Sequence, residues 1–492
     1  MTEFRAIEVR TPAGSVMGEA RGGIVDFRGV RYGDRVRAGD RFSELAEPRT
    51  AQSEGAAFPQ RPGALDALLG DALGELPRSD DAFVLRIQAP EGAEALPVLV
   101  FIPGGGFLSG AAHARWFEGS PLVTEGPLVL VTVNYRCGAL GHLGPEGSLG
   151  EANRGLRDLK RALRWIGANI AAFGGDPGRI TLAGDSAGAW YAQVLSVAPD
   201  MAGLFSRTAF VSFPFEPPLD AQGYAVRRAA ALDSAEPRGA GFAELGTEQL
   251  LDAQLAVARA FAGRGMALMP AADGVEISAD IADLGARALD AHVDAFALIT
   301  TSEEAAGFLR SVPDEAFPWP AVEGYLAARF ENPTAAAEVL EAKRPDATPK
   351  ERMIDAMTLF QFRSAALEIV AAASRAGKRS WLAELRLQSP LDHAYSPHCF
   401  ILPFLFGNRE RWHDAPMLEG IEATAFARTS AGLREWLLGF VRGGAPELGG
   451  LPLPAFDAAA PLSLEFDGEG ARLEAPAEWG LEPRRAPRAG GA

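Results

Sequence analysis

The chain has 492 residues, of which 48% are hydrophobic and 23% charged, and its formal net charge is −17. Such an acidic chain lacks the basic surface that nucleic acids and anionic membranes require, so we expect neither as a partner. It has only two cysteines, Cys137 and Cys399, no signal-peptide core at the N-terminus and no apolar run long enough to span a membrane. These features exclude a disulfide framework and predict a soluble, cytoplasmic protein.

The first third of the chain predicts strands. Residues 7–11 and 24–27 alternate apolar with polar side chains, as half-buried antiparallel strands do. Three further apolar runs of strand length follow at 83–89, 96–103 and 128–135. We interpret these runs as strands of a central sheet.

A helix and a strand-to-helix junction come next. Residues 156–173 have apolar side chains on one helical face, and Gly174 and Gly175 end that helix. Residues 179–183 predict a short buried strand, and 189–197 predict a helix. Alternating strands and helices indicate an α/β fold, in which a mostly parallel sheet is covered by helices on both faces.

The second half is mainly helical. It has two Ala-rich blocks at about 212–292 and 313–376, strands at 293–301 and 381–387, and a helix at 433–441. In the second block, Thr348 to Glu351 is typical of a capping box. We expect one catalytic domain over residues 1–483, with the two blocks as cap elements over the sheet, and a disordered tail at 484–492.

The most informative motif joins the strand at 179–183 to the helix that follows. Gly184, Asp185, Ser186, Ala187 and Gly188 form the pattern G-x-S-x-G. Between a strand and a helix this pattern predicts a nucleophile elbow, a strained turn that exposes the serine hydroxyl. Ser186 is therefore the candidate nucleophile.

A serine hydroxyl needs a general base, which is usually a histidine oriented by a carboxylate. In the elbow arrangement both partners follow the serine in the chain, acid first. Among the six histidines, only His393 and His398 lie in a loop after a later strand, and Glu303 and Glu304 directly follow the strand at 293–301. The residues alone do not separate the two histidines or the two glutamates.

An oxyanion hole is the third requirement. Gly104, Gly105 and Gly106 directly follow the apolar strand at 96–103. Consecutive glycines allow bare backbone N–H groups to face a substrate carbonyl oxygen. The N–H of Ala187, the residue after the nucleophile, is a further candidate donor.

Over nearly its whole length the chain resembles the type-B carboxylesterases, the family of the para-nitrobenzyl esterases and cholinesterases. The similar segments are FRGVRYG at 27–33, the strand and glycine loop at 96–107, VNYRCGALG at 133–141, NIAAFGGDP at 169–177 and LPFLFGN at 402–408. The resemblance implies an α/β-hydrolase fold and a serine esterase. It also implies Ser186, Glu304 and His398 as catalytic residues and Gly105, Gly106 and Ala187 as the oxyanion hole.

The chain departs from the family pattern at several positions. Pro103 replaces a common histidine before the glycines, Asp185 replaces a glutamate beside the nucleophile, and Glu303-Glu304-Ala305 replaces Asp-Glu-Gly. Ile401 replaces an acidic residue, and the segment Asp80-Asp81-Ala82 lacks a cysteine that disulfide-bonded secreted members have. None of these changes removes a group that the chemistry requires.

We therefore predict hydrolysis of carboxylic esters through an acyl-enzyme, with no metal or cofactor. The predicted partner is a small ester of apolar character, because aromatic residues are frequent in and near the two cap blocks: Phe213, Phe215, Phe308, Phe317, Trp319, Phe360 and Phe362. Two alternatives stay open: the same triad could act on amides, thioesters or lactones, or the chain could be a non-catalytic binding protein on an esterase scaffold.

Overall fold

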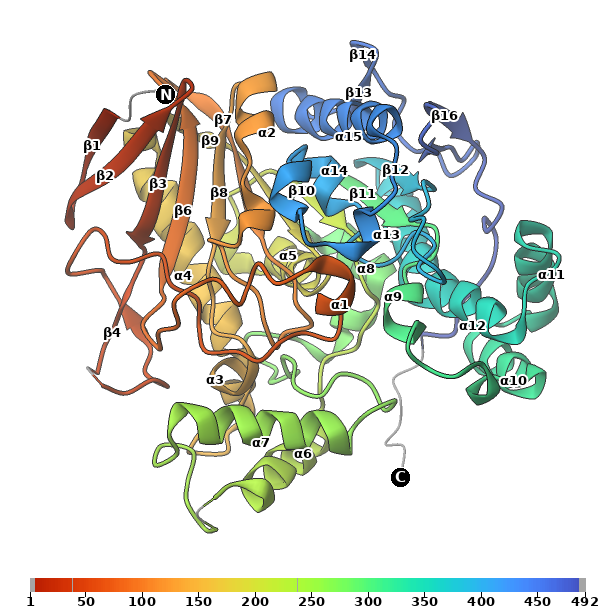
Figure 1. Ribbon diagram of the computed structural model, residues 1–492, viewed down its shortest axis with the longest axis horizontal. Coiled ribbons are helices and arrows are strands. Elements are labelled where there is room, and N and C mark those ends of the chain that lie inside the picture. The colour runs from red at the N-terminus through yellow and green to blue at the C-terminus, as the bar shows by residue number, and fades with distance from the viewer. Residues whose placement is uncertain (1–4, 38, 237, 486–492) are drawn as a thin grey trace.

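A twelve-stranded sheet forms the centre of the protein (Figure 1), whose computed structural model describes residues 5–37, 39–236 and 238–485. The strand order is β1-β2-β3-β6-β8-β7-β9-β10-β11-β12-β15-β16. The strands in that order are β1 Arg5–Thr11, β2 Gly14–Arg21, β3 Ile24–Arg31, β6 Val84–Pro90, β8 Val129–Val133, β7 Leu96–Ile102, β9 Gly175–Asp185, β10 Arg207–Val211, β11 Ala295–Thr301, β12 Arg379–Leu385, β15 Ser463–Phe466 and β16 Ala471–Glu474.

The middle of this sheet is parallel. All neighbouring pairs from β8 to β15 run parallel, whereas β1, β2, β3 and β6 on one side and β16 on the other pair antiparallel. The carboxyl ends of parallel strands meet at one edge of a sheet. The segments after β7, β9, β11 and β12 therefore converge there, and they are the segments that contain the predicted site residues.

Helices cover both faces of the sheet, because the side chains of each buried strand alternate between the faces. In β7, Val98, Val100 and Ile102 belong to one apolar cluster, together with α4 (Arg154–Asn169), α5 (Ala187–Val197) and α13 (Ser364–Arg375). Leu99 and Phe101 belong to the other cluster, with α14 (Leu402–Phe406) and α15 (Ala423–Gly443). The predicted α/β fold is confirmed.

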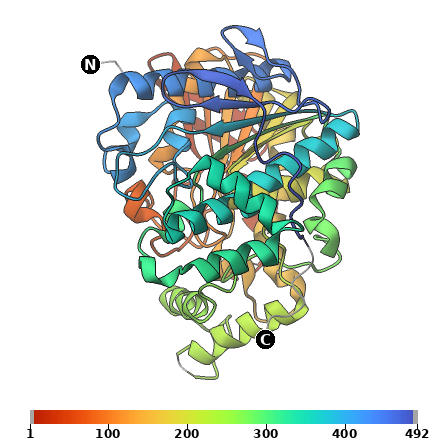
Figure 2. The ribbon, with the colours of Figure 1, turned by 90° about the vertical axis from the view of Figure 1, so that its right-hand side faces the viewer.

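The two Ala-rich blocks form groups of helices outside the sheet (Figures 1 and 2). The first contains α6 (Ala221–Ser234) and α7 (Thr247–Ala260), and the second contains α10 (Trp319–Arg329), α11 (Pro333–Lys343) and α12 (Pro349–Thr358). The predicted capping box begins α12: Glu351 N donates to Thr348 Oγ1 at 3.3 Å, and Thr348 N donates to Glu351 Oε2 at 2.7 Å. The domain boundary at 483 stays a prediction.

Several elements differ from the sequence prediction. The strands β2, β10, β15 and β16 were not predicted, β9 begins earlier, and α15 begins ten residues before the predicted helix. A π-helical turn, η7 (Leu359–Arg363), joins α12 to α13. The stretch Pro349–Arg375 around it is long and apolar enough to cross a membrane, but 83% of its most apolar window is buried in the protein, as in core helices.

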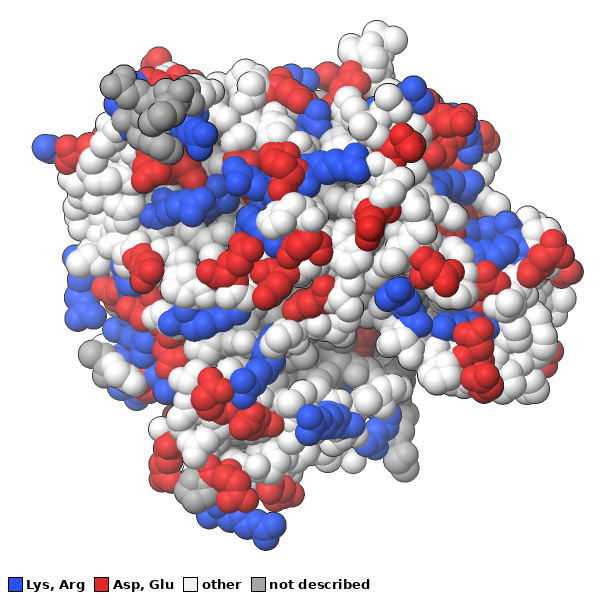
Figure 3. Space-filling model, viewed as in Figure 1, with Lys and Arg blue, Asp and Glu red and all other residues white. Residues whose placement is uncertain are grey.

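The predicted disordered tail is wrong at its first two residues. Arg484 N donates to Arg329 O at 2.7 Å, and Arg485 Nη1 donates to Phe360 O at 2.8 Å, so these arginines are held against the second helical block. Residues 486–492, and residues 1–4 of the N-terminal segment, lie outside the described residues. Both cysteines are buried and free. On the face in Figure 3, acidic and basic side chains are interspersed.

Candidate active site

Ser186 lies at the junction of β9 and α5 in a strained backbone conformation. Its φ is 53° and its ψ is −122°, which is rare for a residue with a side chain. Ser186 N donates to Val211 O at 2.9 Å, and Trp190 N donates to Ser186 O at 3.0 Å. Hydrogen bonds to the neighbouring strand β10 and to helix α5 thus hold the turn, as a nucleophile elbow requires.

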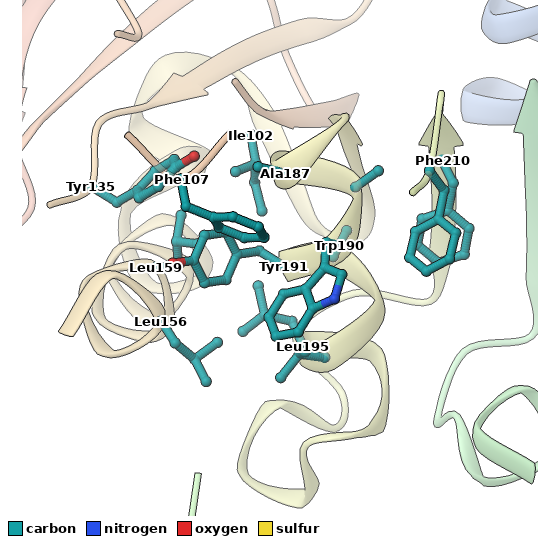
Figure 4. Packing of buried hydrophobic residues seen from close by; sticks show 14 of the residues in the cluster. Ile102, Phe107, Tyr135, Leu156, Leu159, Ala187, Trp190, Tyr191, Leu195 and Phe210 are labelled. Atoms are coloured by element: carbon teal, nitrogen blue, oxygen red, sulfur yellow. The ribbon is translucent and has the colours of Figure 1, made fainter. Parts of the chain in front are cut away.

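The two glycines of the motif permit close contacts that a side chain would prevent. A Cβ on Gly188 would lie 2.0 Å from Ile102 O, and one on Gly184 would lie 2.4 Å from the backbone carbon of Gly188. Below the elbow, Phe107 packs edge-on against Trp190 and Tyr191, with ring centroids 5.4 and 5.5 Å apart (Figure 4). The glycine loop and the elbow therefore share one packed core.

The loop after β12 brings His398 to the segment after β11, residues 302–305, which we call the acidic turn. His398 Nδ1 lies 2.6 Å from Glu304 Oε2, and His398 N donates to Glu304 O at 3.1 Å. Glu304 Oε1 accepts a bond from Thr301 N at 2.8 Å. Both side chains are almost completely buried. His393 is instead half-exposed beside Asp392, and Glu303 does not bond His398, so the geometry favours the pair Glu304 and His398.

The second ring nitrogen of His398 is available for catalysis. Nε2 is buried and has no hydrogen-bond partner, Ser186 included, in the part of the chain that the structure describes. The charge of His398 acts on Asp185, the residue before Ser186, and opposes the rise in the pKa of that carboxyl group. In catalytic sites without substrate, such bonds are often long and tighten only in the complex.

The electrostatic surroundings of His398 stabilise its protonated form. Burial alone would lower the pKa of His398, but interactions with Cys399 and Glu304 raise it well above its usual value. Burial also raises the pKa of the Cys399 thiol, whereas its interaction with His398 opposes that rise. Phe308 and Phe362 flank the imidazole, with ring centroids 5.1 and 5.2 Å from it.

The glycine loop has the form of an oxyanion hole. Gly105 and Gly106 have φ values of 129° and 60°, and Gly105 O accepts bonds from Leu108 N and Ser109 N at 3.0 and 3.1 Å. Within the described residues, the backbone N–H groups of Gly105, Gly106 and Ala187 donate to no acceptor. These donors are therefore free to bind a substrate oxygen.

Two side chains hold this loop where Pro103 replaces the common histidine. Tyr135 Oη donates to Pro103 O at 2.8 Å, and Gly104 N donates to Asp185 Oδ1 at 2.8 Å. Burial raises the pKa of Asp185 to about 6, although the bond from Gly104 and the nearby His398 oppose the rise. Asp185, which is shorter than the glutamate of the family pattern, thus connects the turn at Ser186 to the glycine loop at 104–106, the predicted oxyanion loop.

The predicted aromatic residues have different surroundings. Phe308 and Phe362 contact the His398 ring, and Phe308 and Trp319 expose 43% and 48% of their surface. Phe215 and Phe360 instead stack with Arg485, and Phe213 packs in the core. The sequence does not distinguish these roles, because an aromatic residue in a helical block suits either of them.

A cavity of about 740 Å³ lies behind the acidic turn, and Ser302, Lys343, Asp355 and Trp479 are among its lining residues. Neither Ser186 nor His398 lines it. Among the described residues, no group of three or more histidine, cysteine or acidic side chains could hold a metal ion. The chemistry that this site can perform is nucleophilic attack by serine with histidine as the base.

Comparison with known proteins agrees with this geometry. The model of the carboxylesterase family matches residues 5–456. The chain belongs to the carboxylesterase family. The predicted resemblance and the α/β-hydrolase fold are thereby confirmed, and so is the prediction that this protein is an enzyme that hydrolyses carboxylic esters.

Three similar proteins support the assignment to the carboxylesterases. Phenmedipham hydrolase from Pseudarthrobacter oxydans is 31% identical over 486 residues, covering 94% of this chain and 95% of the relative. The "Probable N-octanoylanthranilate hydrolase" of Rhodococcus erythropolis is 30% identical over 451 residues, covering 89% and 93%. The solved structure of a carboxylesterase from Geobacillus stearothermophilus has a TM-score of 0.80 at 25% identity, covering 96% of this chain and 98% of its own.

Proposed function

We propose that Ser186 is the nucleophile of this carboxylesterase, His398 its general acid and base, and Glu304 the residue that orients His398. The observation that carries this proposal is the buried 2.6 Å contact between His398 Nδ1 and Glu304 Oε2, at the sheet edge where Ser186 lies on its strained turn. In such a triad the carboxylate fixes the imidazole tautomer and stabilises the imidazolium that forms during the reaction.

The reaction has two half-reactions. Ser186 Oγ attacks the ester carbonyl carbon and His398 Nε2 takes its proton, while the N–H groups of Gly105, Gly106 and Ala187 bind the oxyanion. Collapse of this intermediate breaks the bond to the alcohol, which leaves with the proton from His398. A water molecule, deprotonated by His398, then attacks the acyl-enzyme, releasing the acid and restoring Ser186.

The proposed substrates are small esters with an apolar acyl or alcohol group. Phe308 and Trp319 are partly exposed, and Phe308 lies beside His398, so an apolar group of the substrate can pack there. We also propose a cytoplasmic location, supported by two buried cysteines that form no disulfide. A series of aryl esters with acyl chains of graded length tests the substrate preference.

Replacement of Ser186 tests the catalytic assignment. Ser186→Ala removes the attacking oxygen, so turnover of 4-nitrophenyl butyrate should fall by about 10⁶-fold or to background. Ser196→Ala is the matched control: Ser196 lies on the same helix, α5, and donates only to Gln193 O. Undiminished hydrolysis by Ser186→Ala would refute the assignment.

Amide hydrolysis is a second candidate activity, favoured by the relative named for N-octanoylanthranilate. The proposed groups allow it, because esters and amides pass through the same tetrahedral species. Rates on 4-nitrophenyl octanoate and on the matched 4-nitroanilide separate the two activities. A higher kcat/KM on the anilide would make the protein an amidase in practice.

A further inference from the structure

The carboxylate of Glu303 does not bond His398 but belongs to a separate network at the acidic turn. Its side chain is 3% exposed, and Oε2 accepts a bond from Ser302 Oγ at 2.6 Å. Its other oxygen, Oε1, lies 3.3 Å from both Lys343 Nζ and Arg344 Nη2. A buried carboxylate with two cationic partners is a built feature of the fold, because an unpaired one would not be tolerated there.

Glu303 also bonds directly to the loop that carries His398. Ser396 N donates to Glu303 Oε2 at 3.2 Å, and Glu303 N donates to Ser396 O at 3.2 Å. Ser396 Oγ and Ser302 N both bond to Leu385 O at the end of β12. The acidic turn and the loop that carries His398 are therefore joined at Ser396, two residues before His398, by bonds that are separate from those of Glu304.

The loop that carries His398 needs such support because its backbone is strained. His393, Tyr395 and Cys399 have φ values of 56°, 53° and 69°, although none of them is glycine. Non-glycine residues persist in this region only where surrounding contacts hold them. The bonds from Glu303 are made within this strained segment.

The cations come from the end of α11, in the second helical block. Lys343 Nζ donates to Ser302 O at 2.6 Å, and the Arg344 guanidinium lies 4.5 Å from the centre of the Tyr395 ring. Asp355 on α12 lies 3.5 Å from both cations and balances part of their charge. The end of α11 thus contacts both the acidic turn and the loop that carries His398.

We propose that Glu303 is a positioning residue for the reaction, and that with Lys343 and Arg344 it forms a rear anchor that fixes the distance between Glu304 and His398. The inference rests on the proposed roles of those two residues. The rear anchor touches no substrate. It acts by keeping the imidazole at the place from which Nε2 meets the serine hydroxyl, and small misplacements of such a group are costly.

The first test of the rear anchor removes the charge of Glu303. Glu303→Gln keeps the size of the side chain but leaves Lys343 and Arg344 facing an amide, which weakens the links to Ser396. We expect kcat on 4-nitrophenyl butyrate to fall about ten- to a hundredfold with little change in KM, because the substitution alters neither the glycine loop at 104–106 nor the aromatic side chains Phe308 and Trp319. The matched control is Glu341→Gln, the same change at an exposed position of α11.

The pH profile separates positioning from mere stability. A loosened contact with Glu304 lowers the pKa of His398, so the acidic limb of kcat/KM should shift to lower pH in Glu303→Gln but not in Glu341→Gln. A variant with wild-type kcat and an unchanged limb would overturn the proposal, even if its Tm fell.

Variants at Lys343 keep the proposal testable if Glu303→Gln does not fold. Lys343→Met should reproduce part of the loss in kcat, and Lys343→Arg, which retains the cation, should restore it. Wild-type kcat in Lys343→Met would contradict the anchor. If Ser186→Ala remained active, the proposed function would fail instead, so the two failures are distinguishable.

Discussion

At the scale of single residues, the proposed site contains two acids, one beside His398 and one before Ser186. Glu304 bonds His398 Nδ1, whereas Asp185 holds Gly104 in the oxyanion loop. Each acid therefore has a different task, although both lie within the electrostatic surroundings of the same imidazole.

Removing the charge of Glu304 should change the pH dependence of the enzyme. His398 must be neutral to accept the serine proton, and Glu304 raises its pKa by stabilising the imidazolium. In Glu304→Gln we therefore expect the acidic limb of kcat/KM to move to lower pH and kcat to fall about 10³- to 10⁴-fold. If the acidic limb of kcat/KM did not move in Glu304→Gln, a group other than Glu304 would determine its position.

The pairing of these residues could be predicted only in part. The order of serine, acid and histidine reduced the choice to two glutamates and two histidines, and only the family resemblance separated them. The structure explains the difficulty: Glu303 and Glu304 are adjacent and both buried, but their carboxylates have different partners, Ser302 for Glu303 and His398 for Glu304. Side-chain direction in a turn is set by backbone conformation, which a sequence pattern does not reveal.

At the scale of elements, the junction of β9, Ser186 and α5 depends on a close approach to β7. Gly188→Ala would put a Cβ 2.0 Å from Ile102 O, where backbone must shift, so we expect a loss of about 3 kcal/mol or more in the free energy of unfolding. Thermal or urea unfolding of Gly188→Ala measures this loss in the free energy of unfolding.

Gly324→Ala in α10 is the opposite case and serves as its control. Gly324 is an exposed helical residue, and a Cβ there would meet nothing within 4 Å. Its replacement should stabilise the protein by about 0.5–1 kcal/mol, because alanine favours the helix. Equal effects at positions 188 and 324 would contradict the packing described for the elbow.

Strongly apolar strands were predictable, but short or charged ones were not. The runs that became β7, β8 and β11 are mostly apolar, and every residue in them except Leu96 is buried. In contrast, β15 includes Glu465, a buried acid that pairs with Arg386 at 2.8 Å. A buried charge of this kind depends on a partner far away in the chain, so local periodicity does not indicate the strand.

At the scale of the whole molecule, the last described residues join distant parts of the chain. The Arg485 guanidinium lies 4.1 Å from the centre of the Phe215 ring and 4.6 Å from that of Phe360, and it bonds Glu368 on α13 at 3.1 Å. Sequence composition predicted disorder here, because proline, glycine and arginine dominate the segment. The tertiary contacts of Arg485 override that local tendency.

Arg485→Ala should therefore destabilise the protein by about 1–3 kcal/mol, as expected for a mostly buried cation that contacts two rings and a carboxylate. The control is Arg484→Ala, whose partly exposed pair with Glu331 should contribute less than about 0.5 kcal/mol. A thermal unfolding series of both variants measures the difference. Equal Tm values would show that the end of the chain does not hold the helical block.

The most direct test of the catalytic account is to trap the acyl-enzyme or its analogue. A fluorophosphonate ester should add one label per chain, and peptide mass spectrometry should find it on Ser186. His398→Ala should slow the labelling by orders of magnitude, because the hydroxyl then has no base. A label on any other residue, or equally fast labelling without His398, would contradict the central claim that this histidine activates Ser186.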